Sequence, residues 1–458
     1  MKKVLTYMLF LVVMLLSSCQ RDNQNQYLLL GKNNREKYFE PIPYGMVYIQ
    51  RGAHNIGDND DELYEEAPTK VVSTEAFWID DTEITNNEYR QFVYWVRDKR
   101  ARELLGQTYT DFLITEDKYG NPLDEPEINW DEKIEWNDID YQNAMDELYL
   151  PVADRFGFKK EIDTRKLVYE YYWVDYNQAA KRSNSYNYDT QKYDGSVMNE
   201  KGEIVPIQNR SSFLMHESVP VYPDTLCWIR DFAYTYNEPF TLKYFSHAGF
   251  DDYPVVGVTW KQANAFCNWR SNLKSFTMER FKETPPHDFR LPTETEWEVA
   301  ARGGMMNNKY PWGSYYARNV NGCFVANFKP QRGNYVADSE TTTTTMKVGQ
   351  FDPNPYGLYD MAGNVAEWTS TAFFEAGYET MNDLNPEIQY NARPDDPPVM
   401  KRKVVRGGSW KDVAYFIQNS TRTFEYQDTS KSYIGFRCVR TSFRNDLGNK
   451  PKERSTHF

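Results

Sequence analysis

Histidine and cysteine are scarce in this sequence of 458 residues, which contains five of each. The histidines are His54, His216, His247, His287 and His457. None of them stands in an HxxxH or HxxE spacing, which argues against an iron site held by histidines. The cysteines are too widely separated for a zinc pattern such as CxxC repeated twice. The composition therefore excludes the common sequence-local transition-metal sites.

Positive charge and long apolar runs are lacking as well. The chain has 53 Lys and Arg against 66 Asp and Glu, a net charge of −13, and shows no basic stripe that would bind phosphates. A nucleic-acid partner is therefore excluded. We interpret the acidity mainly as a solvated surface, with calcium or a basic partner as the alternative. Because 40% of the residues are hydrophobic and 16% are aromatic, the chain is expected to be globular rather than disordered.

The N-terminus has the three parts of an export signal. Lys2 and Lys3 precede an apolar run from Val4 to Leu16, which is too short to span a membrane. Ser17, Ser18 and Cys19 follow, and small residues before a cysteine resemble a bacterial lipobox. This predicts a signal peptide over 1–18, lipidation at Cys19, and a polar tether over 19–40; a simple signal peptide is the alternative. Gln20, by resemblance to lipoprotein sorting, indicates the outer membrane and a domain that faces the periplasm.

Export places the remaining four cysteines in an oxidising compartment. They are Cys227, Cys267, Cys323 and Cys438. Their even number favours disulfide bonds, and four cysteines allow three pairings.

Three stretches follow the same rule for starting a helix. In each, a threonine stands three residues before Glu or Gln, the spacing of a capping box. The pairs are Thr85 with Glu88, Thr259 with Gln262, and Thr293 with Glu296. Apolar residues follow each pair at helical spacing and are predicted to form core. These are Tyr89, Phe92, Val93 and Val96; Ala263, Phe266 and Cys267; and Trp297, Ala300 and Ala301.

A segment rich in tyrosine and acidic residues, about 100–245, separates the first two of these helices. We expect one helix in it, within 164–184. Its run YEYYWVDY is either a protein-binding face or a small core of the segment itself. The chain ends in a polar tail over 443–458.

Seven motifs occur in order: EITNNEYRQFV, YPVVGVTWKQANAFCNW, FRLPTETEWEVAARGG, YPWG, NPYGLYDMAGNVAEWTS, VVRGGSW and GFRCVR. They resemble the signatures of the formylglycine-generating-enzyme, or sulfatase-modifying-factor, family over about 41–99 and 246–442. The resemblance implies an α+β, C-type-lectin-like domain over 41–442 with little regular secondary structure. The segment at about 100–245 is then a large insertion into that domain.

The resemblance also implies a copper site that this sequence lacks. The family's enzymes hold copper with two cysteines a few residues after the RGGS turn, since thiolates bind soft Cu(I). Here the stretch VVRGGSWKDVAYFIQNSTRTFEYQ, residues 404–427, has neither cysteine nor histidine. Asp412 stands near the first thiol position, and Phe416 or Ile417 near the second. We therefore predict no catalytic residues, no copper and no enzymatic activity.

Other family features are retained. The resemblance implies a structural calcium site made by the side chains of Asp360 and Glu367 with the carbonyls of Gly363 and Val365. The alternative is that Asp360 caps a turn and Glu367 pairs with an arginine. A weaker second site would use Asn327 and Asp338. The family also pairs the cysteines that correspond to Cys267 and Cys438, which leaves Cys227 and Cys323 for a second bridge.

The lipobox, the tether and the tyrosine-rich insertion together resemble one group within this family. That group is the gliding-motility lipoprotein K, or PorK-type, group of the type IX secretion system, with the related lipoprotein J group as the alternative. The resemblance implies a structural lipoprotein that self-associates into periplasmic rings with a soluble N-type partner subunit, the insertion being the candidate interface. The other functions considered are a lectin-like or peptide-binding lipoprotein that uses the former substrate groove, and a residual enzyme.

Overall fold

The computed structural model describes residues 40, 42–58, 67–117, 119–155, 157, 159–199, 202–280, 285–336 and 341–443. The predicted signal peptide, the lipidation site at Cys19 and nearly all of the polar tail lie outside these residues. Residues 42–447 form one compact unit, to which all the elements below belong.

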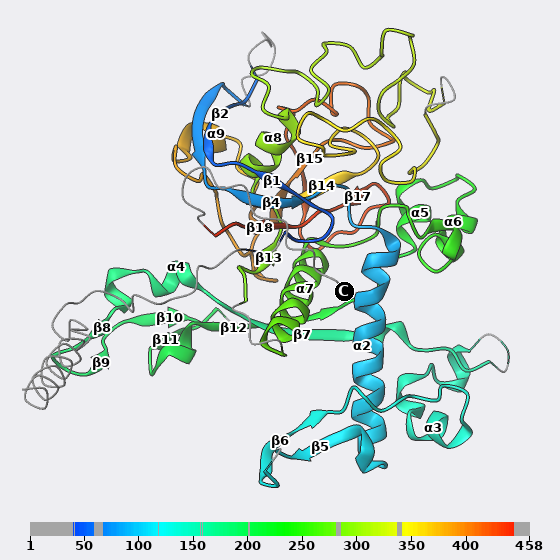
Figure 1. Cartoon of the computed structure of the whole chain (residues 1–458), viewed down its shortest axis with the longest axis vertical. Helices are drawn as coiled ribbons and strands as arrows, with labels where there is room; N and C mark the ends of the chain where they lie inside the picture. The colour runs from blue at the N-terminus through cyan, green and yellow to red at the C-terminus, as the bar shows by residue number, and fades with distance from the viewer. Residues whose placement is uncertain are drawn as a thin grey trace, which may run out of the picture. The chain divides into compact units, whose positions relative to one another are not determined.

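Two four-stranded sheets form the centre of the domain (Figure 1). The first has the order β1-β4-β18-β13 and is antiparallel. Its strands are β1 (Met46–Ile49), β4 (Phe77–Asp80), β18 (Val439–Thr441) and β13 (Phe289–Arg290). Since β18 pairs with β4, the last strand of the chain closes on one of the first. This sheet joins the two parts of the chain that carry the family motifs.

The second sheet carries the strands that flank the RGGSW turn. Its order is β16-β15-β14-β17, with β17 parallel to β14. The strands are β14 (Ala366–Ala372), β15 (Arg402–Arg406), β16 (Thr423–Tyr426) and β17 (Ile434–Gly435). A separate two-stranded pair, β2 (Gly52–Ile56) with β3 (Lys70–Thr74), lies near the N-terminal end of the domain.

The three predicted helix starts are confirmed. The helices are α2 (Asn86–Gly106), α7 (Trp260–Arg280) and α8 (Glu294–Arg302). Reciprocal threonine and Glu/Gln hydrogen bonds form at each start. Such a box satisfies backbone donors that the first helical turn would otherwise leave unpaired.

The residues predicted from helical spacing are all buried. Tyr89 and Phe92 of α2 meet Phe266 of α7, with ring centroids 5.6 and 5.9 Å from the Phe266 ring. Together with Trp368 of β14 these rings belong to the main hydrophobic cluster, while Trp297 of α8 belongs to a second one. Aromatic burial on this scale dominates the stability of a domain that has few long elements.

The helix predicted within 164–184 is wrong. Residues Val168–Val174 form strand β7, paired antiparallel with β12 (Leu214–Pro220). The helical structure within this range is short, namely α4 (Tyr176–Ala179) and the 3₁₀ turns Thr164–Lys166 and Arg182–Asn184. The run is rich in β-branched and aromatic residues, and Tyr169 faces inward while Tyr172 is exposed, an alternation that belongs to a strand.

The rest of the insertion is built from short paired strands and short helices. The strand pairs are β5 (Leu113–Glu116) with β6 (Pro122–Ile128), β8 (Tyr186–Asn187) with β9 (Lys192–Tyr193), and β10 (Ser196–Met198) with β11 (Ile204–Pro206). The short helices are α3 (Ile139–Ala144), α5 (Cys227–Asp231), α6 (Glu238–Lys243) and, outside the insertion, α9 (Gly377–Thr380). Figure 1 shows the β7–β12 pair leaving α7 toward α4 and β8–β11.

The tyrosine-rich run contributes to buried clusters, and its role as a protein-binding face stays a prediction. Tyr169 lies in the main hydrophobic cluster, and Val197, Ile207 and Phe213 form a small separate cluster in the insertion. Tyr172, in contrast, is 66% exposed. Among the described residues no helix is long and apolar enough to cross a membrane. The predicted α+β fold with little regular secondary structure is confirmed.

Candidate functional site at the RGGSW turn

The turn after β15 is held by two glycines in the left-handed region. Gly407 has φ 86° and Gly408 has φ 62°. A Cβ atom on Gly408 would lie 2.6 Å from the carbonyl oxygen of Phe416, so only glycine fits this close approach. The turn is tied to the DMAGNVAEW loop by hydrogen bonds from Gly363 N to Gly407 O and from Trp410 N to Asn364 O, at 2.9 and 3.0 Å.

The two positions where copper-binding thiols would stand have structural contacts. Asp412 Oδ2 accepts hydrogen bonds from the backbone N and the Oγ of Ser409, at 3.0 and 2.6 Å, and Lys411 Nζ lies 2.9 Å from Oδ1. Ile417 is fully buried in a hydrophobic cluster, while Phe416 is partly exposed. Asp412 thus closes the turn, and Ile417 anchors the segment that follows it.

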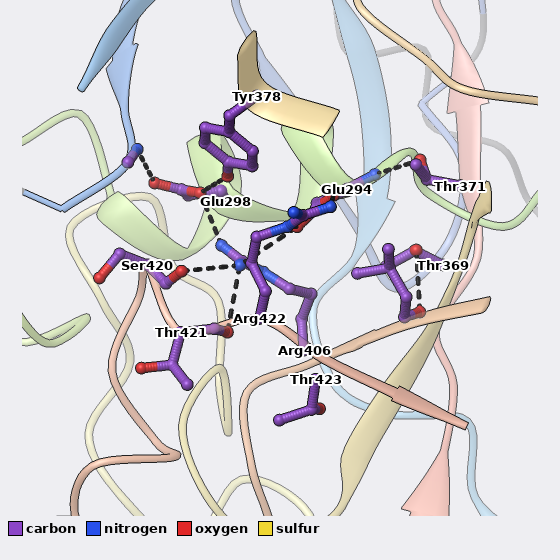
Figure 2. Close-up of polar contacts among 12 residues, drawn as sticks. Glu294, Glu298, Thr369, Thr371, Tyr378, Arg406, Ser420, Thr421, Arg422 and Thr423 are labelled. Atoms are coloured by element: carbon purple, nitrogen blue, oxygen red, sulfur yellow. Dashed lines mark hydrogen bonds and ion pairs between the residues drawn. The ribbon is translucent and has the colours of Figure 1, made fainter. Parts of the chain in front are cut away.

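Beneath the turn lies a buried network of ion pairs that the sequence reading missed (Figure 2). Arg406, the last residue of β15, is completely buried between two glutamates of α8. Its Nη2 lies 2.6 Å from Glu298 and its Nη1 lies 3.3 Å from Glu294. The same guanidinium donates to the carbonyls of Ser420 and Thr421 at 3.0 and 3.1 Å. One arginine therefore joins β15, α8 and the 419–422 segment.

Two further arginines complete the network. Arg422 holds both oxygens of Glu294, at 2.6 and 2.9 Å, and Arg302 lies 2.7 Å from Glu298. Tyr378 donates its hydroxyl to Glu298 at 2.5 Å. Three guanidinium groups face two carboxylates in a space closed to solvent.

The charge balance decides the protonation of this network. Burial by itself would raise the pKa of Glu298, but Arg302 and Arg406 outweigh it and hold the pKa below its ordinary value. Burial raises the pKa of the Tyr378 hydroxyl far above its usual range. Glu298 is therefore ionised and Tyr378 is neutral. The carboxylates pair with guanidinium groups and the network is closed to solvent, although Arg406 Nε has no hydrogen-bond partner among the described residues, so the network is suited to hold the fold together.

The predicted calcium residues do not act as a single group. Glu367 lies against Arg437, with both carboxylate oxygens within 2.9 Å of the guanidinium, and its Oε2 accepts from Trp297 Nε1 at 2.7 Å. Asp360 has φ 54° and accepts from Gly349 N at 2.6 Å. Both features match the alternative reading, a turn residue and an arginine partner.

The sequence reading also missed Glu83, a carboxyl that the fold places at the same cluster. Glu83 is fully buried, its Oε1 accepts from Asn364 Nδ2 at 3.1 Å, and its Oε2 has no hydrogen-bond partner among the described residues. Burial and the charge of Asp360 raise the pKa of Glu83 well above its ordinary value, and burial raises the pKa of Asp360 to about 6. Three carboxyls thus share the single guanidinium of Arg437.

This excess of negative charge is the feature that fits a bound cation. Calcium prefers several oxygen ligands, and Asp360 beside Glu83 could supply them without displacing Arg437 from Glu367. As the side chains are placed, the described residues contain no group of three or more His, Cys, Asp or Glu side chains that could hold a metal ion. The calcium site stays a prediction, with Glu83 as a ligand candidate in addition to Asp360, Gly363, Val365 and Glu367.

The second calcium site is not assembled by the described residues. Asn327 is fully buried, and its amide donates to Thr344 O at 2.9 Å and accepts from Thr342 N at 3.2 Å. Its predicted partner Asp338 lies outside the described residues. Asn327 therefore has a structural role in holding the threonine-rich loop.

Cys267 of the AFCNW motif and Cys438 of the GFRCVR motif come close together in the fold. Their Sγ atoms lie 3.5 Å apart, and both residues are buried. They are free thiols in this structure, as are Cys227 in α5 and the half-buried Cys323. The Cys267–Cys438 bridge stays a prediction that this proximity favours. Cys227 packs with Trp228 and Trp410, whereas no contact brings Cys323 to it.

Comparison with known proteins agrees with the fold. The chain is 33% identical over 200 residues to the formylglycine-generating enzyme of Bos taurus, covering 41% of this chain and 44% of that protein. It is 34% identical over 194 residues to the inactive C-alpha-formylglycine-generating enzyme 2 of Bos taurus, covering 41% and 50%. The chain thus spans at most half the length of these relatives.

Among solved structures, the structure of PvdO from Pseudomonas aeruginosa matches with a TM-score of 0.41 at 15% identity, covering 86% of this chain and 94% of that one. The model of the sulfatase-modifying factor enzyme 1-like domain matches residues 35–210 and 226–442. The chain therefore belongs to the formylglycine-generating-enzyme, or sulfatase-modifying-factor, family.

Proposed function

We propose that this protein is a non-catalytic member of its family, anchored to the outer membrane through Cys19 and acting as a structural subunit of a type IX secretion ring. In this proposal it binds further copies of itself and one soluble N-type periplasmic subunit. The observation that carries the proposal is the segment after the RGGSW turn, where Asp412 and Ile417 have structural contacts at positions that hold thiols in the family's enzymes.

Chemistry at the turn supports a structural role. Formation of formylglycine needs a thiolate pair to capture copper, and residues 411–427 contain no cysteine. The buried ion pairs around Arg406 are instead suited to rigidity, since they join β15, α8 and the 419–422 segment at one guanidinium. A ring subunit needs a rigid body with two different contact surfaces, because each copy binds its neighbours head to tail.

The insertion supplies the surface that we assign to the partner. Tyr172, Tyr176 and Tyr188 are 66%, 74% and 85% exposed, and all belong to the β7–β12 pair or to the elements at its far end. Tyrosine contributes a large contact area with few rotamers to freeze, and for that reason it is common at interfaces. We call the β7–β12 pair, together with the elements at its far end, the insertion arm. Apolar side chains buried against α2 and α7 fix the base of this arm, so the exposed tyrosines on it are held in place for contact with a partner.

Purification from the native host in a mild detergent tests the proposal. The expected result is a large annular assembly, seen by electron microscopy, that contains this chain and one stoichiometric soluble protein. Mass spectrometry of the intact chain should show acyl groups on Cys19. A monomer that carries copper, or that converts a cysteine-containing peptide to formylglycine, would overturn the proposal.

A further inference from the structure

A cleft lies between the β7–β12 arm and the body of the domain, and its lining contains no residue of the RGGSW turn. The cleft has a volume of about 590 Å³ and is lined by β7 and α4 on one side and by α7, α8 and the 385–391 loop on the other. Two smaller cavities, of about 290 and 450 Å³, continue from it along the arm. Trp173 lines all three.

The lining of the 590 Å³ cavity has a distinctive chemistry. Ten of its residues carry neutral hydroxyl or amide side chains, namely four threonines, one serine, four asparagines and one glutamine. Four are aromatic, and the aliphatic lining is limited to alanine, valine and proline. A lipid or an apolar peptide anchor would require aliphatic walls, which this cleft lacks.

Four of the five charged residues that line the cleft have side-chain partners. Arg290 holds both oxygens of Glu296, at 2.6 and 2.7 Å. Glu387 accepts from Ser370 at 2.6 Å, and Asp175 caps α4 by accepting from Gln178 N at 3.0 Å. Glu75 is the fifth, and the one guanidinium of the lining is already engaged with Glu296, so the cleft offers no free cation to an anionic ligand.

Aromatic rings remain available on the walls. Trp173 belongs to none of the hydrophobic clusters formed by the described residues, although it is only partly exposed. Trp260 is fixed in place, because its Nε1 donates to Thr369 O at 2.8 Å and Lys403 Nζ lies over one face of the ring, 3.8 Å from the centroid. Trp173 is therefore the better candidate of the two to offer flat apolar surface to the C–H side of a sugar ring.

Thr74 lines the main cavity and Gln427 lines the second, and both residues are more than nine-tenths buried. Thr74 Oγ1 and Gln427 Oε1 have no hydrogen-bond partner among the described residues. Both oxygens are closed to solvent, so a ligand in the open cleft does not reach them, and the polar character of the cleft comes from its other hydroxyl and amide groups.

We infer that this cleft is a binding site for a neutral oligosaccharide, with Trp173 as its stacking residue. The inference does not rest on the ring function or on the RGGSW turn, although Tyr176, which we assign to the partner surface, also lines the cleft. It involves no chemical conversion of the ligand. The arm is held over the cleft by a hydrogen bond from Asn177 to Gln389 at 3.1 Å, which joins the two walls.

Isothermal titration calorimetry on the full chain tests the site, in a detergent whose head group is not a sugar. The probes are cellotetraose, maltotetraose and chitotetraose. At least one is expected to bind with a dissociation constant below about 1 mM. Trp173→Ala should weaken that binding at least tenfold, and Trp173→Phe should weaken it less because a flat ring remains.

Tyr188→Ala is the matched control, since Tyr188 is 85% exposed and lines none of the three cavities of the cleft. The affinity of this variant should equal that of the wild type. The inference is overturned if none of the three probes binds, or if Tyr188→Ala weakens binding as much as Trp173→Ala. It is also overturned if an unglycosylated peptide displaces the bound probe. Circular dichroism of each variant establishes that the fold is intact.

Discussion

At the scale of single residues, the carboxyl pair formed by Asp360 and Glu83 makes stability depend on pH. The folded-state pKa of Asp360 is about 6, above the ordinary value of 3.8, so the folded chain binds this proton more tightly than the unfolded chain does. The free energy of unfolding should therefore fall as pH rises from about 4 to about 6, by roughly 2–3 kcal/mol from this group. Urea unfolding in EDTA across this range measures the effect.

Asp360→Asn should abolish most of that fall, because asparagine accepts the positive φ of this position without carrying a charge. Asp252→Asn, at a side chain that is 68% exposed, is the control and should leave the pH profile unchanged. If calcium binds at this cluster, it should stabilise the wild type at pH 7 and have no effect on Asp360→Asn. Equal calcium effects on the two proteins would contradict the assignment.

Arg406 carries a second prediction at the residue scale. Arg406→Met leaves Glu294 and Glu298 buried with fewer partners, and breaking a buried ion pair from one side costs about 3–5 kcal/mol. Equilibrium unfolding in urea should show a loss of this size. Arg100→Met removes a surface pair of α2 with Glu147 and should cost less than about 1 kcal/mol. Similar losses in the two variants would mean that the network contributes little.

At the scale of elements, the segment after the RGGSW turn is predicted to be structural. Asp412→Ala removes the hydrogen bonds from Ser409 and should cost about 1–2 kcal/mol while assembly and secretion stay intact. Asp412→Asn keeps an acceptor for Ser409 and should cost less. Loss of secretion by Asp412→Ala with an unchanged melting temperature would show that this residue has a functional role.

The disulfide prediction concerns Cys267 of α7 and Cys438, which directly precedes β18. If Cys267 and Cys438 are bonded in the exported protein, Cys438→Ser should lower stability by about 4–5 kcal/mol in the chain-entropy account, because 171 positions separate the two cysteines. Reduction of the wild type with dithiothreitol should give the same stability as the variant. Free thiols in the protein isolated from the periplasm would contradict the bond.

At the scale of the whole molecule, the insertion arm should be separable from the domain. Val174 and Leu214 face each other at the end of the β7–β12 pair, so residues 175–213 can be replaced by an Asn-Gly hairpin turn. The small cluster around Val197 leaves with the arm, whereas the main clusters on α2, α7 and α8 stay. We expect a folded monomer with nearly unchanged melting temperature that no longer recovers the N-type partner in a pull-down. Retained partner binding would place the interface elsewhere.

Much of this molecule followed from the sequence by itself. Capping boxes and helical spacing predicted α2, α7 and α8 and their buried faces, since these are local rules that act within one or two turns. Ordered motifs predicted the family and fold. The absence of cysteine from residues 411–427 predicts that the copper ligands are missing, because no other side chain of that segment can supply a thiolate.

Tertiary structure alone decided which distant groups meet. The YEYYWV run forms a strand because β12 pairs with it. The fold also places Glu83 beside Asp360, 277 positions away, and Arg437 beside Glu367, 70 positions away. It also joined Arg406 to two glutamates of α8 and left Trp173 open over a polar cleft. Local patterns cannot predict such contacts, because their energies depend on burial and on partners that only the folded chain brings together.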